Sequence, residues 1–394
     1  MPSRLASLSA LSCLLFCAAA IAEESAPRGI TIEGAWTGEV FGNARGGVER
    51  GARHLSNADL TLALDGAAFG AEGFKLFAYG LYDDGGAISG DLVGDAQGVS
   101  NIEADPAARL YELWAEQAFS FGSLRFGLYD LNSEFDAIET AGLFLGASHG
   151  IGPDFSQSGL NGPSIFPVTS LAGRLALHVG PAVLRFAALD GVPGDPSHPK
   201  RTTIRFERGD GALLVGEVDY SVGERARAAL GLWRYTGRFE RVRDAVLATP
   251  GELHTGNLGA YAFVESALWS EGDGEGLAGF LRAGFADGDV NAFSHYLGAG
   301  FVYTGALPRR PEDQLGLAVA HARFGDEFRD AQAQLGRAWG RAETALELTY
   351  RIALTDWFAL QPDLQYVASP SGDPNLRDAL AIGIRFELRA GRSW

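Results

Sequence analysis

The most recognisable chemical spacing lies in the middle of the chain, where residues 146–150 read GASHG. This matches G-x-S-x-G, the pattern of a nucleophile elbow, and it would make Ser148 the nucleophile of a hydrolase. An elbow needs a strand before the serine and a helix after it. Apolar residues do precede it, but the sequence Ile151-Gly152-Pro153-Asp154 would end a helix at once. We therefore interpret residues 142–167 as a long irregular loop and expect no catalytic residue, with hydrolysis by Ser148 kept as the less favoured alternative.

Metal and thiol chemistry have equally little support. The seven histidines form neither an HExxH motif nor an i,i+4 pair, and the Asp-rich stretches 83–86 and 287–289 lack EF-hand spacing. Turns between strands are the simpler interpretation of those two stretches. Both cysteines, Cys13 and Cys17, lie within residues 1–22, which are predicted below to be a cleaved signal peptide. The mature chain would then have no thiol for catalysis, metal binding or a disulfide. We expect no metal site and no cofactor.

The remaining candidates are ionic and aromatic side chains around the 142–167 segment. In the wall of a water-filled pore most such charges are simply solvated, and we expect this for more than half of them. Those at the narrowest point would set selectivity. The candidates outside the segment are Glu112, Trp114, Glu116, Arg125, Asp130, Glu134, Asp136, Arg174, Arg185 and Asp190. Those within it are Ser148, His149, Asp154, Phe155 and Asn161.

Residues 1–22 predict export. Arg4 precedes an apolar run that ends in Ala20-Ile21-Ala22, which is typical of a secretory signal peptide cleaved after Ala22. Residues 23–394 would then form a single domain. Cleavage would remove one arginine and no acid, so the formal net charge of −17 would become −18. We expect no nucleic-acid partner, because such a chain cannot neutralise phosphates.

The elements that must position these residues are strands. In the C-terminal segment LAIGIRFELRAGRSW, the even positions from Leu380 to Leu388 are apolar, whereas the odd positions include Arg385, Glu387 and Arg389. This period of two predicts a strand with one apolar and one charged face. Turning an arginine toward lipid near the bilayer midplane costs roughly 2–4 kcal/mol, so the apolar face should face outward.

The same alternation recurs along the chain. Residues 346–354 and 358–366 are predicted to form a hairpin around Thr355-Asp356, with a bulge or an unpaired position at Pro362. Residues 107–119 are ambiguous, because Leu110, Leu113 and Trp114 could also form a helical stripe. Further strands are expected near 30–41, 57–64, 73–82, 123–130, 171–179, 182–189, 212–220, 227–236, 256–268, 278–286, 294–304 and 313–323, with a weaker one near 202–208.

These segments favour an all-β, transmembrane antiparallel barrel of about 16 strands, since single-chain bacterial barrels use even numbers. The strands of a soluble β-sandwich, such as a secreted lectin, also alternate between polar and apolar residues. Its interior would have to bury Arg, Glu, Asp and Gln on strand after strand, at several kcal/mol for each unpaired charge. A water-filled barrel avoids that cost, and its closure satisfies the backbone amides of the edge strands.

Several longer motifs make the chain resemble the carbohydrate-selective porin (OprB-like) family over most of residues 23–394. They are GAWTGEVFGNARGG, LYELWAEQAF, LRFGLYDLNSEFD, GASHGIGPDFSQSGLNGPSIFP, RFAALDGVPGDP, LQPDLQYVASPSGDPN and ALAIGIRFEL. The resemblance implies a 16-stranded barrel in the cell outer membrane through which small sugars diffuse passively into the periplasm. It also implies that residues 142–167 fold inward as a constriction loop. One departure is Arg392, which interrupts the apolar face just before Trp394.

The partners that follow are small sugars, which carboxylates and arginines can hydrogen-bond and aromatic rings can stack against, and outer-membrane lipid. The barrel assembly machinery would recognise the C-terminal strand ending in Trp394. The protein would be a monomer or a homotrimer. A general porin without sugar preference, selective for anions or cations, remains the alternative, because the net charge includes loop residues and does not decide between them.

Overall fold

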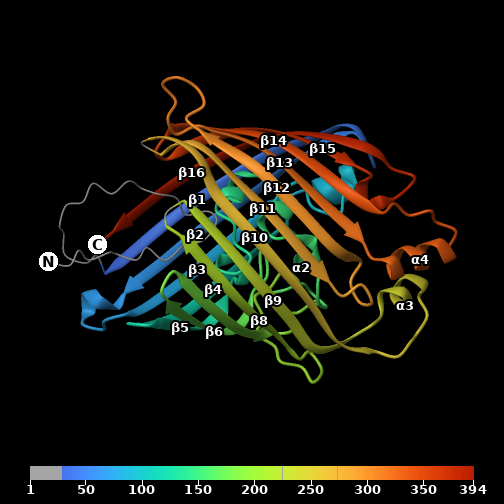
Figure 1. Cartoon of the computed structure of the whole chain (residues 1–394), viewed down its shortest axis with the longest axis horizontal. Coiled ribbons are helices and arrows are strands. Elements are labelled where there is room, and N and C mark those ends of the chain that lie inside the picture. The colour runs from blue at the N-terminus through green and yellow to red at the C-terminus, as the bar shows by residue number, and fades with distance from the viewer. Residues whose placement is uncertain (1–28, 224, 273) are drawn as a thin grey trace.

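The computed structural model describes residues 29–223, 225–272 and 274–394, and in these the chain forms sixteen antiparallel strands that close into one barrel (Figure 1). Every strand pairs with its neighbours along the chain, and β1 closes the barrel on β16. The predicted signal peptide lies outside the described residues. The strands are β1 (Ile30–Gly47), β2 (Gly51–Asp65), β3 (Phe74–Gly85), β4 (Ala107–Phe119), β5 (Gly122–Tyr129), β6 (Ser170–Val179), β7 (Ala182–Asp190), β8 (Ala212–Val222), β9 (Ala226–Phe239), β10 (His254–Gly272), β11 (Glu275–Ala286), β12 (Phe293–Thr304), β13 (Gln314–Phe324), β14 (Ala342–Thr355), β15 (Phe358–Ala368) and β16 (Arg377–Ser393).

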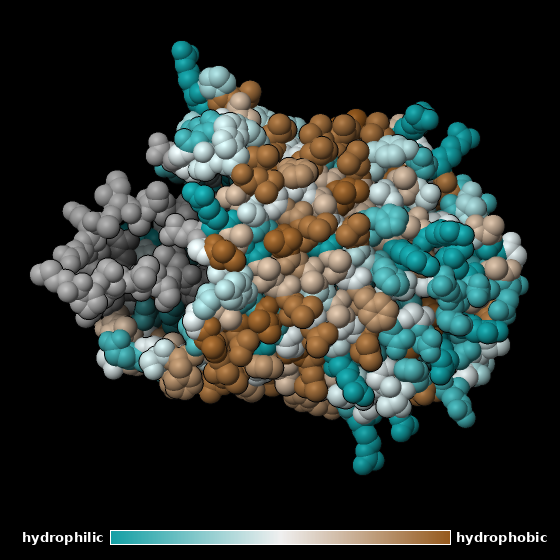
Figure 2. Space-filling view, viewed as in Figure 1, coloured by the Kyte–Doolittle hydropathy of each residue, from teal (hydrophilic) through white to brown (hydrophobic). Residues whose placement is uncertain are grey.

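The predicted alternation of faces is confirmed. On β16, Ile382 is 50% exposed on the outside, whereas Arg385 is 3% exposed on the inside. Exposed apolar residues lie on strands around the whole barrel and form an apolar belt, which crosses the middle of the face shown in Figure 2. Hydrophilic residues cover the end that carries α3 and α4. An apolar belt beside a polar end matches the surface of a barrel in a bilayer. None of the helices in the described residues is long and apolar enough to cross a membrane.

A β-bulge in strand β4 explains why the sequence of residues 107–119 is also compatible with a helix. Its pairing with β3 shifts by one residue between Tyr79 and Gly80, which creates a β-bulge around Tyr111. A bulge places two residues opposite one and re-aims their side chains. Leu110 and Leu113 therefore both face outward, three residues apart, while Tyr111 and Glu112 both line the interior. The bulge breaks the period of two and produces the apparent helical stripe.

Two other local predictions have clear outcomes. The hairpin between β14 and β15 is confirmed, and their register passes from the pair Thr349–Asp363 to Ile352–Leu360, leaving Pro362 out of the pairing with β14. The weak strand near 202–208 is wrong, because these residues belong to the loop between β7 and β8. Here Thr202 hydrogen-bonds the backbone of Leu110 with its hydroxyl, instead of extending a ladder.

The connections differ in length at the two ends of the barrel. At one end the strands are joined by short turns such as 120–121, 180–181 and 356–357. At the other end two long loops, 86–106 and 130–169, enter the barrel, and α2 lies inside it (Figure 1). The helices are η1 (Gly66–Phe69), η2 (Ser89–Val93), η3 (Leu131–Ser133), η4 (Thr140–Leu143), α1 (Ala147–Gly150), α2 (Pro153–Ser156), α3 (Val242–Leu247), α4 (Asp326–Gln334) and η5 (Pro370–Gly372).

Candidate functional site

A cavity of about 1460 Å³ occupies the space that the two long loops leave open inside the barrel. On one side it is lined by inward-facing residues of β1 to β4, including Thr37, Asn57 and Thr61. On the other side it is lined by residues of the 86–106 and 130–169 loops. At the turn end it reaches Asp356 and Trp357. The cavity thus extends from the level of the loops to the opposite end of the barrel.

Five aromatic side chains form a continuous row along the cavity wall. Trp114 stacks on Phe77 with ring centroids 5.0 Å apart, and Phe77 meets the edge of Tyr79 at 6.4 Å. Tyr79 meets Tyr111 edge-on at 5.0 Å, and Tyr111 meets Phe166 at 6.4 Å. All five line the cavity. We call these residues the aromatic row.

Carboxylates accompany the aromatic row. The Tyr79 hydroxyl donates to Asp59 Oδ1 at 2.7 Å. Glu112, which the β4 bulge turns inward, accepts from the Trp114 indole N–H at 3.2 Å and from the backbone N–H of Asp130 at 3.0 Å. Burial raises the pKa of Asp130 to about 6. The arrangement combines apolar ring faces with hydrogen-bond acceptors, which suits a ligand that has both C–H surfaces and hydroxyl groups.

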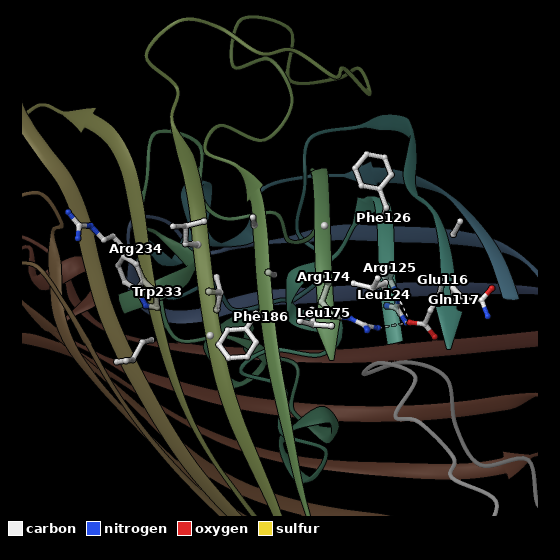
Figure 3. A pocket seen from close by; sticks show the side chains of 18 of the residues that line it. Glu116, Gln117, Leu124, Arg125, Phe126, Arg174, Leu175, Phe186, Trp233 and Arg234 are labelled. Carbon is white, nitrogen blue, oxygen red and sulfur yellow. Dashed lines mark hydrogen bonds and ion pairs between the residues drawn. The ribbon is translucent and has the colours of Figure 1, made fainter. Parts of the chain in front are cut away.

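An ion-paired cluster lies at the end of the aromatic row. The Arg125 guanidinium covers the Trp114 ring at 3.9 Å and pairs with Glu116 at 2.9 Å. Arg174 also reaches Glu116, as Figure 3 shows, and pairs with Glu134 at 2.7 Å. Burial would raise the pKa of Glu134, but the guanidinium groups of Arg125 and Arg174 outweigh it and lower that pKa to about 2. The two arginines and two glutamates therefore neutralise each other.

The opposite wall is covered by the 130–169 loop, which is held by buried ion pairs. Arg282 on β11 pairs with Asp136 at 2.6 Å and with Asp154 at 2.7 Å, and all three side chains are buried. Phe155 of the loop stacks on Trp233 of β9, with ring centroids 4.9 Å apart and planes 4° from parallel. The loop is thus packed into the barrel as a small core, partly apolar and partly ionic.

Inward glutamates on the covered wall accept hydrogen bonds from loop backbone amides. Glu347 accepts from Leu145 at 2.6 Å and from Gly146 at 2.9 Å. Three other glutamates do the same: Glu217 for the amide of Asp136, Glu265 for Thr140, and Glu343 for Ala96 and Gln97. Irregular backbone inside a barrel needs partners for its N–H groups, and these carboxylates supply them.

The predicted lining residues fall into three sets. Glu112, Trp114, Arg125 and Asp130 line the cavity, together with Glu134. Glu116 and Arg174 adjoin it through Arg125. Asp136, Arg185 and Asp190 are placed outside the lining: Arg185 pairs with Glu217 and Asp219 at 2.9 Å each, and Asp190 accepts from the backbone of Val192. Six of these charges lie in ion-pair networks and are not singly solvated: Glu116, Arg125, Glu134, Asp136, Arg174 and Arg185.

The predicted loop residues serve to seat the 130–169 loop. The Ser148 hydroxyl is buried and donates to the carbonyl of Gln97 at 3.2 Å, while the Ser148 carbonyl accepts from Tyr296. Burial lowers the pKa of His149 to about 4, which keeps its ring neutral near pH 7. Asn161 donates to the carbonyl of Pro193. The serine sits in a four-residue helix after Gly146, without the strand and long helix of an elbow, so the hydrolase alternative is wrong.

The 86–106 loop was missed by the sequence analysis. Its Ser100 donates to Glu39 on β1 at 2.7 Å, and Glu39 also pairs with Arg385 on β16. Its residues Gln97, Ser100 and Glu103 line the cavity. The available signal was the length of the gap between two strong strand patterns. That length alone does not tell whether a loop folds inward or away from the barrel.

A second hollow, of about 880 Å³, lies on the outer surface over β4 to β9 (Figure 3). Its outward side chains include Phe126 and Phe186, which are 63% and 51% exposed. These residues belong to the apolar belt. The hollow is therefore part of the membrane-facing surface, separate from the interior cavity.

Comparison with known proteins adds a family and a fold. The profile of the family described as "Carbohydrate-selective porin, OprB family" matches residues 49–389. Porin B of Pseudomonas aeruginosa is 24% identical over 351 residues, covering 77% of this chain and 74% of that protein. The high-pH structure of Pseudomonas putida OprB has a TM-score of 0.81 at 20% identity and covers 92% of this chain and 94% of its own. The outer membrane channel DcaP of Acinetobacter baumannii has a TM-score of 0.58 at 11% identity, covering 92% and 97%.

Proposed function

Because the chain belongs to the OprB family of carbohydrate-selective porins and is an outer-membrane porin, we propose that it lets small sugars diffuse passively into the periplasm in preference to other solutes of similar size. Passage needs no energy input, since the open cavity itself is the pathway. The chain is a channel and not an enzyme.

The aromatic row carries the proposal. Sugar rings present C–H faces that pack on aromatic rings and hydroxyl edges that hydrogen-bond to carboxylates, and the cavity wall offers both within one strip. Tyr79 and Phe166 are its partly exposed members, whereas Phe77, Tyr111 and Trp114 are buried. Weak contacts repeated along a path favour entry without trapping the solute, as conduction requires.

Liposome swelling and sugar block of single-channel current test the proposal. Swelling should be faster with glucose than with uncharged solutes of equal size that lack a sugar ring. Replacing Tyr79 and Phe166 by Leu removes two aromatic contacts worth about 0.5–1.5 kcal/mol each, so the apparent sugar affinity should fall by about fivefold to a hundredfold.

The matched control is Phe126→Leu, which removes a phenylalanine ring from the lipid-facing side, where it is 63% exposed. It should leave swelling rates and sugar block unchanged. If the rates for the wild-type protein follow solute size alone, the sugar preference is refuted, and the protein is a general porin.

The N-terminal and C-terminal segments carry two further proposals. Residues 1–22 act as an export signal, so that the mature protein should begin at Glu23 when its N-terminus is sequenced. Strand β16 and Trp394 present the assembly signal, and Trp394→Ala should lower the amount of folded protein in the outer membrane. An unchanged amount would remove Trp394 from that role.

A further inference from the structure

The ionic residues that line the cavity are strongly biased toward carboxylates. Among the described residues, the lining contains the guanidinium groups of three arginines: Arg125, Arg351 and Arg389. It contains nine carboxylates: Glu33, Asp59, Glu103, Glu112, Asp130, Glu134, Glu312, Asp356 and Glu387. This bias concerns the solute path alone, unlike the net charge of the whole chain, which also counts loops and outer surface.

Each lining arginine is already paired with a carboxylate. Arg125 pairs with Glu116, and Arg351 and Arg389 both pair with Glu387 at 2.9 Å. Arg125 is further surrounded by the neutral cluster it forms with Arg174 and two glutamates. The charge of Arg125 is therefore compensated within its cluster, and Arg351 and Arg389 are both held at one shared carboxylate near the turn end.

Four lining carboxylates have a different environment. Within the described part of the chain, Asp59, Glu103, Glu112 and Asp130 form no ion pair. Arg125 is near enough for its charge to act on Glu112, but it pairs with Glu116. The hydrogen-bond donors of the four carboxylates are neutral: a tyrosine hydroxyl for Asp59, an indole and a backbone amide for Glu112, and backbone amides for Glu103 and Asp130. Neutral donors do not offset the negative charge of a carboxylate when it is ionised.

These four carboxylates come from different sides of the cavity. Asp59 stands on β2 and Glu112 on β4, Asp130 begins the 130–169 loop, and Glu103 stands near the end of the 86–106 loop. A path with one sign of charge and walls of low dielectric concentrates the field and raises the local concentration of the opposite ion. Carboxylate rings select cations in the same way in other channels.

We propose that Asp59, Glu103, Glu112 and Asp130 make the pore selective for the charge of its solutes, admitting neutral and cationic ones and holding back anions. In chemical classes, neutral sugars and amino sugars pass, whereas sugar acids and sugar phosphates are disfavoured. The inference rests on the pore and not on the proposed sugar preference.

The reversal potential of the full-length mature protein in a planar bilayer, measured in a KCl gradient at pH 8 without sugar, tests the inference. K⁺ should permeate at least about threefold faster than Cl⁻ at 0.1 M salt, where the screening length is about 10 Å. The ratio should approach one at 1 M salt, where that length is about 3 Å. Liposome swelling should rank glucosamine and glucose above gluconate.

Substitutions assign the effect to residues. Asp59→Asn together with Asp130→Asn should lower the K⁺ to Cl⁻ ratio about twofold or more, and Glu103→Gln alone should lower it less, as expected from the charges removed. Asp326→Asn, which removes an exposed carboxylate from α4 outside the lining, is the matched control and should change nothing. Glu103→Gln keeps the test valid if the double variant fails to fold.

A K⁺ to Cl⁻ permeability ratio of one or below in the wild type overturns the inference. It is also overturned if Glu103→Gln and the variant with both Asp59→Asn and Asp130→Asn keep the wild-type ratio. Glucose permeating no faster than other solutes of its size, with the K⁺ preference intact, would refute the sugar proposal and leave this inference standing.

Discussion

Inward and outward side chains alternate in the same way on two walls of the barrel, one formed by β1 to β4 and the other by β8 to β15. The inward residues of the two walls have different surroundings. On the first wall, residues such as Thr37, Asp59 and Tyr79 face the open cavity. On the second wall, Glu217, Glu265 and Glu347 are covered by the 130–169 loop and accept its backbone amides. The alternation decides which residues point inward, and the loop decides whether they meet water.

The difference has an energetic cause. A backbone amide that leaves water without a hydrogen-bond partner costs about 1–3 kcal/mol, and a loop inside a barrel presents many of them. Carboxylates on the surrounding strands are strong acceptors and remove that cost. The same residue type thus lines the open cavity on one wall and holds the 130–169 loop in place on the other.

The largest expected effect comes from removing the buried cation of the covered wall. Arg282→Gln leaves Asp136 and Asp154 buried without a partner, which should destabilise the seated loop by about 3–5 kcal/mol. The loop should then leave its place, so single-channel conductance should rise, current noise should increase and protease should cleave within residues 130–169.

The open wall supplies the contrast for that variant. Asp59→Asn should change the free energy of unfolding by about 0.5 kcal/mol or less and should leave the current quiet. Adding Asp136→Asn and Asp154→Asn to Arg282→Gln should restore part of the lost stability. If Arg282→Gln conducts like the wild type and resists protease equally, this ion-pair site does not anchor the loop.

A smaller effect on the stability of the seated loop is expected from replacing one glutamate that accepts hydrogen bonds from its backbone amides. Glu347→Gln keeps the size of the side chain but replaces one of the two oxygens that accept from Leu145 and Gly146 with an NH₂ group, a loss of about 1–1.5 kcal/mol. Hydrogen exchange at those two amides should speed up roughly tenfold. The amide of Thr140, which Glu265 holds, is the internal control and should exchange at its original rate; faster exchange there would mean that the whole loop had loosened.

The smallest effect concerns one carboxylate at the edge of the open cavity. Burial and the nearby Asp95 raise the pKa of Glu103 to about 7, against the hydrogen bond from the Ser89 amide, which lowers it. Glu103 should therefore gain its charge between pH 6 and pH 8, and the K⁺ preference should rise over that window. Because its folded pKa lies above the unfolded value, its stability contribution is greatest at low pH and is lost as pH rises through about 7.

A titration of the K⁺ to Cl⁻ ratio from pH 5.5 to pH 8.5 measures this effect. The step near pH 7 should be present in the wild type and missing in Glu103→Gln. An identical step in both proteins would assign it to another group.

The sequence predicted the fold because the relevant pattern is local. The strand assignments, the hairpin at residues 355–358 and the inward orientation of Arg385 all follow from a period of two and the cost of charges in lipid. The prediction weakened where one inserted residue broke that period, at Tyr111, and where polar alternation occurred in a loop, near residues 202–208. At both places tertiary pairing, and not local preference, decides the structure.

The sequence by itself determined a closed barrel, its apolar outer face and the polar character of its interior, since those depend on neighbours two residues apart. Only the tertiary structure decided which interior charges meet water and which hold a loop. The reason is the range of the contacts: Arg282 meets Asp136 across 146 residues and Glu347 meets Leu145 across 202, distances over which no periodic pattern in the chain specifies a partner.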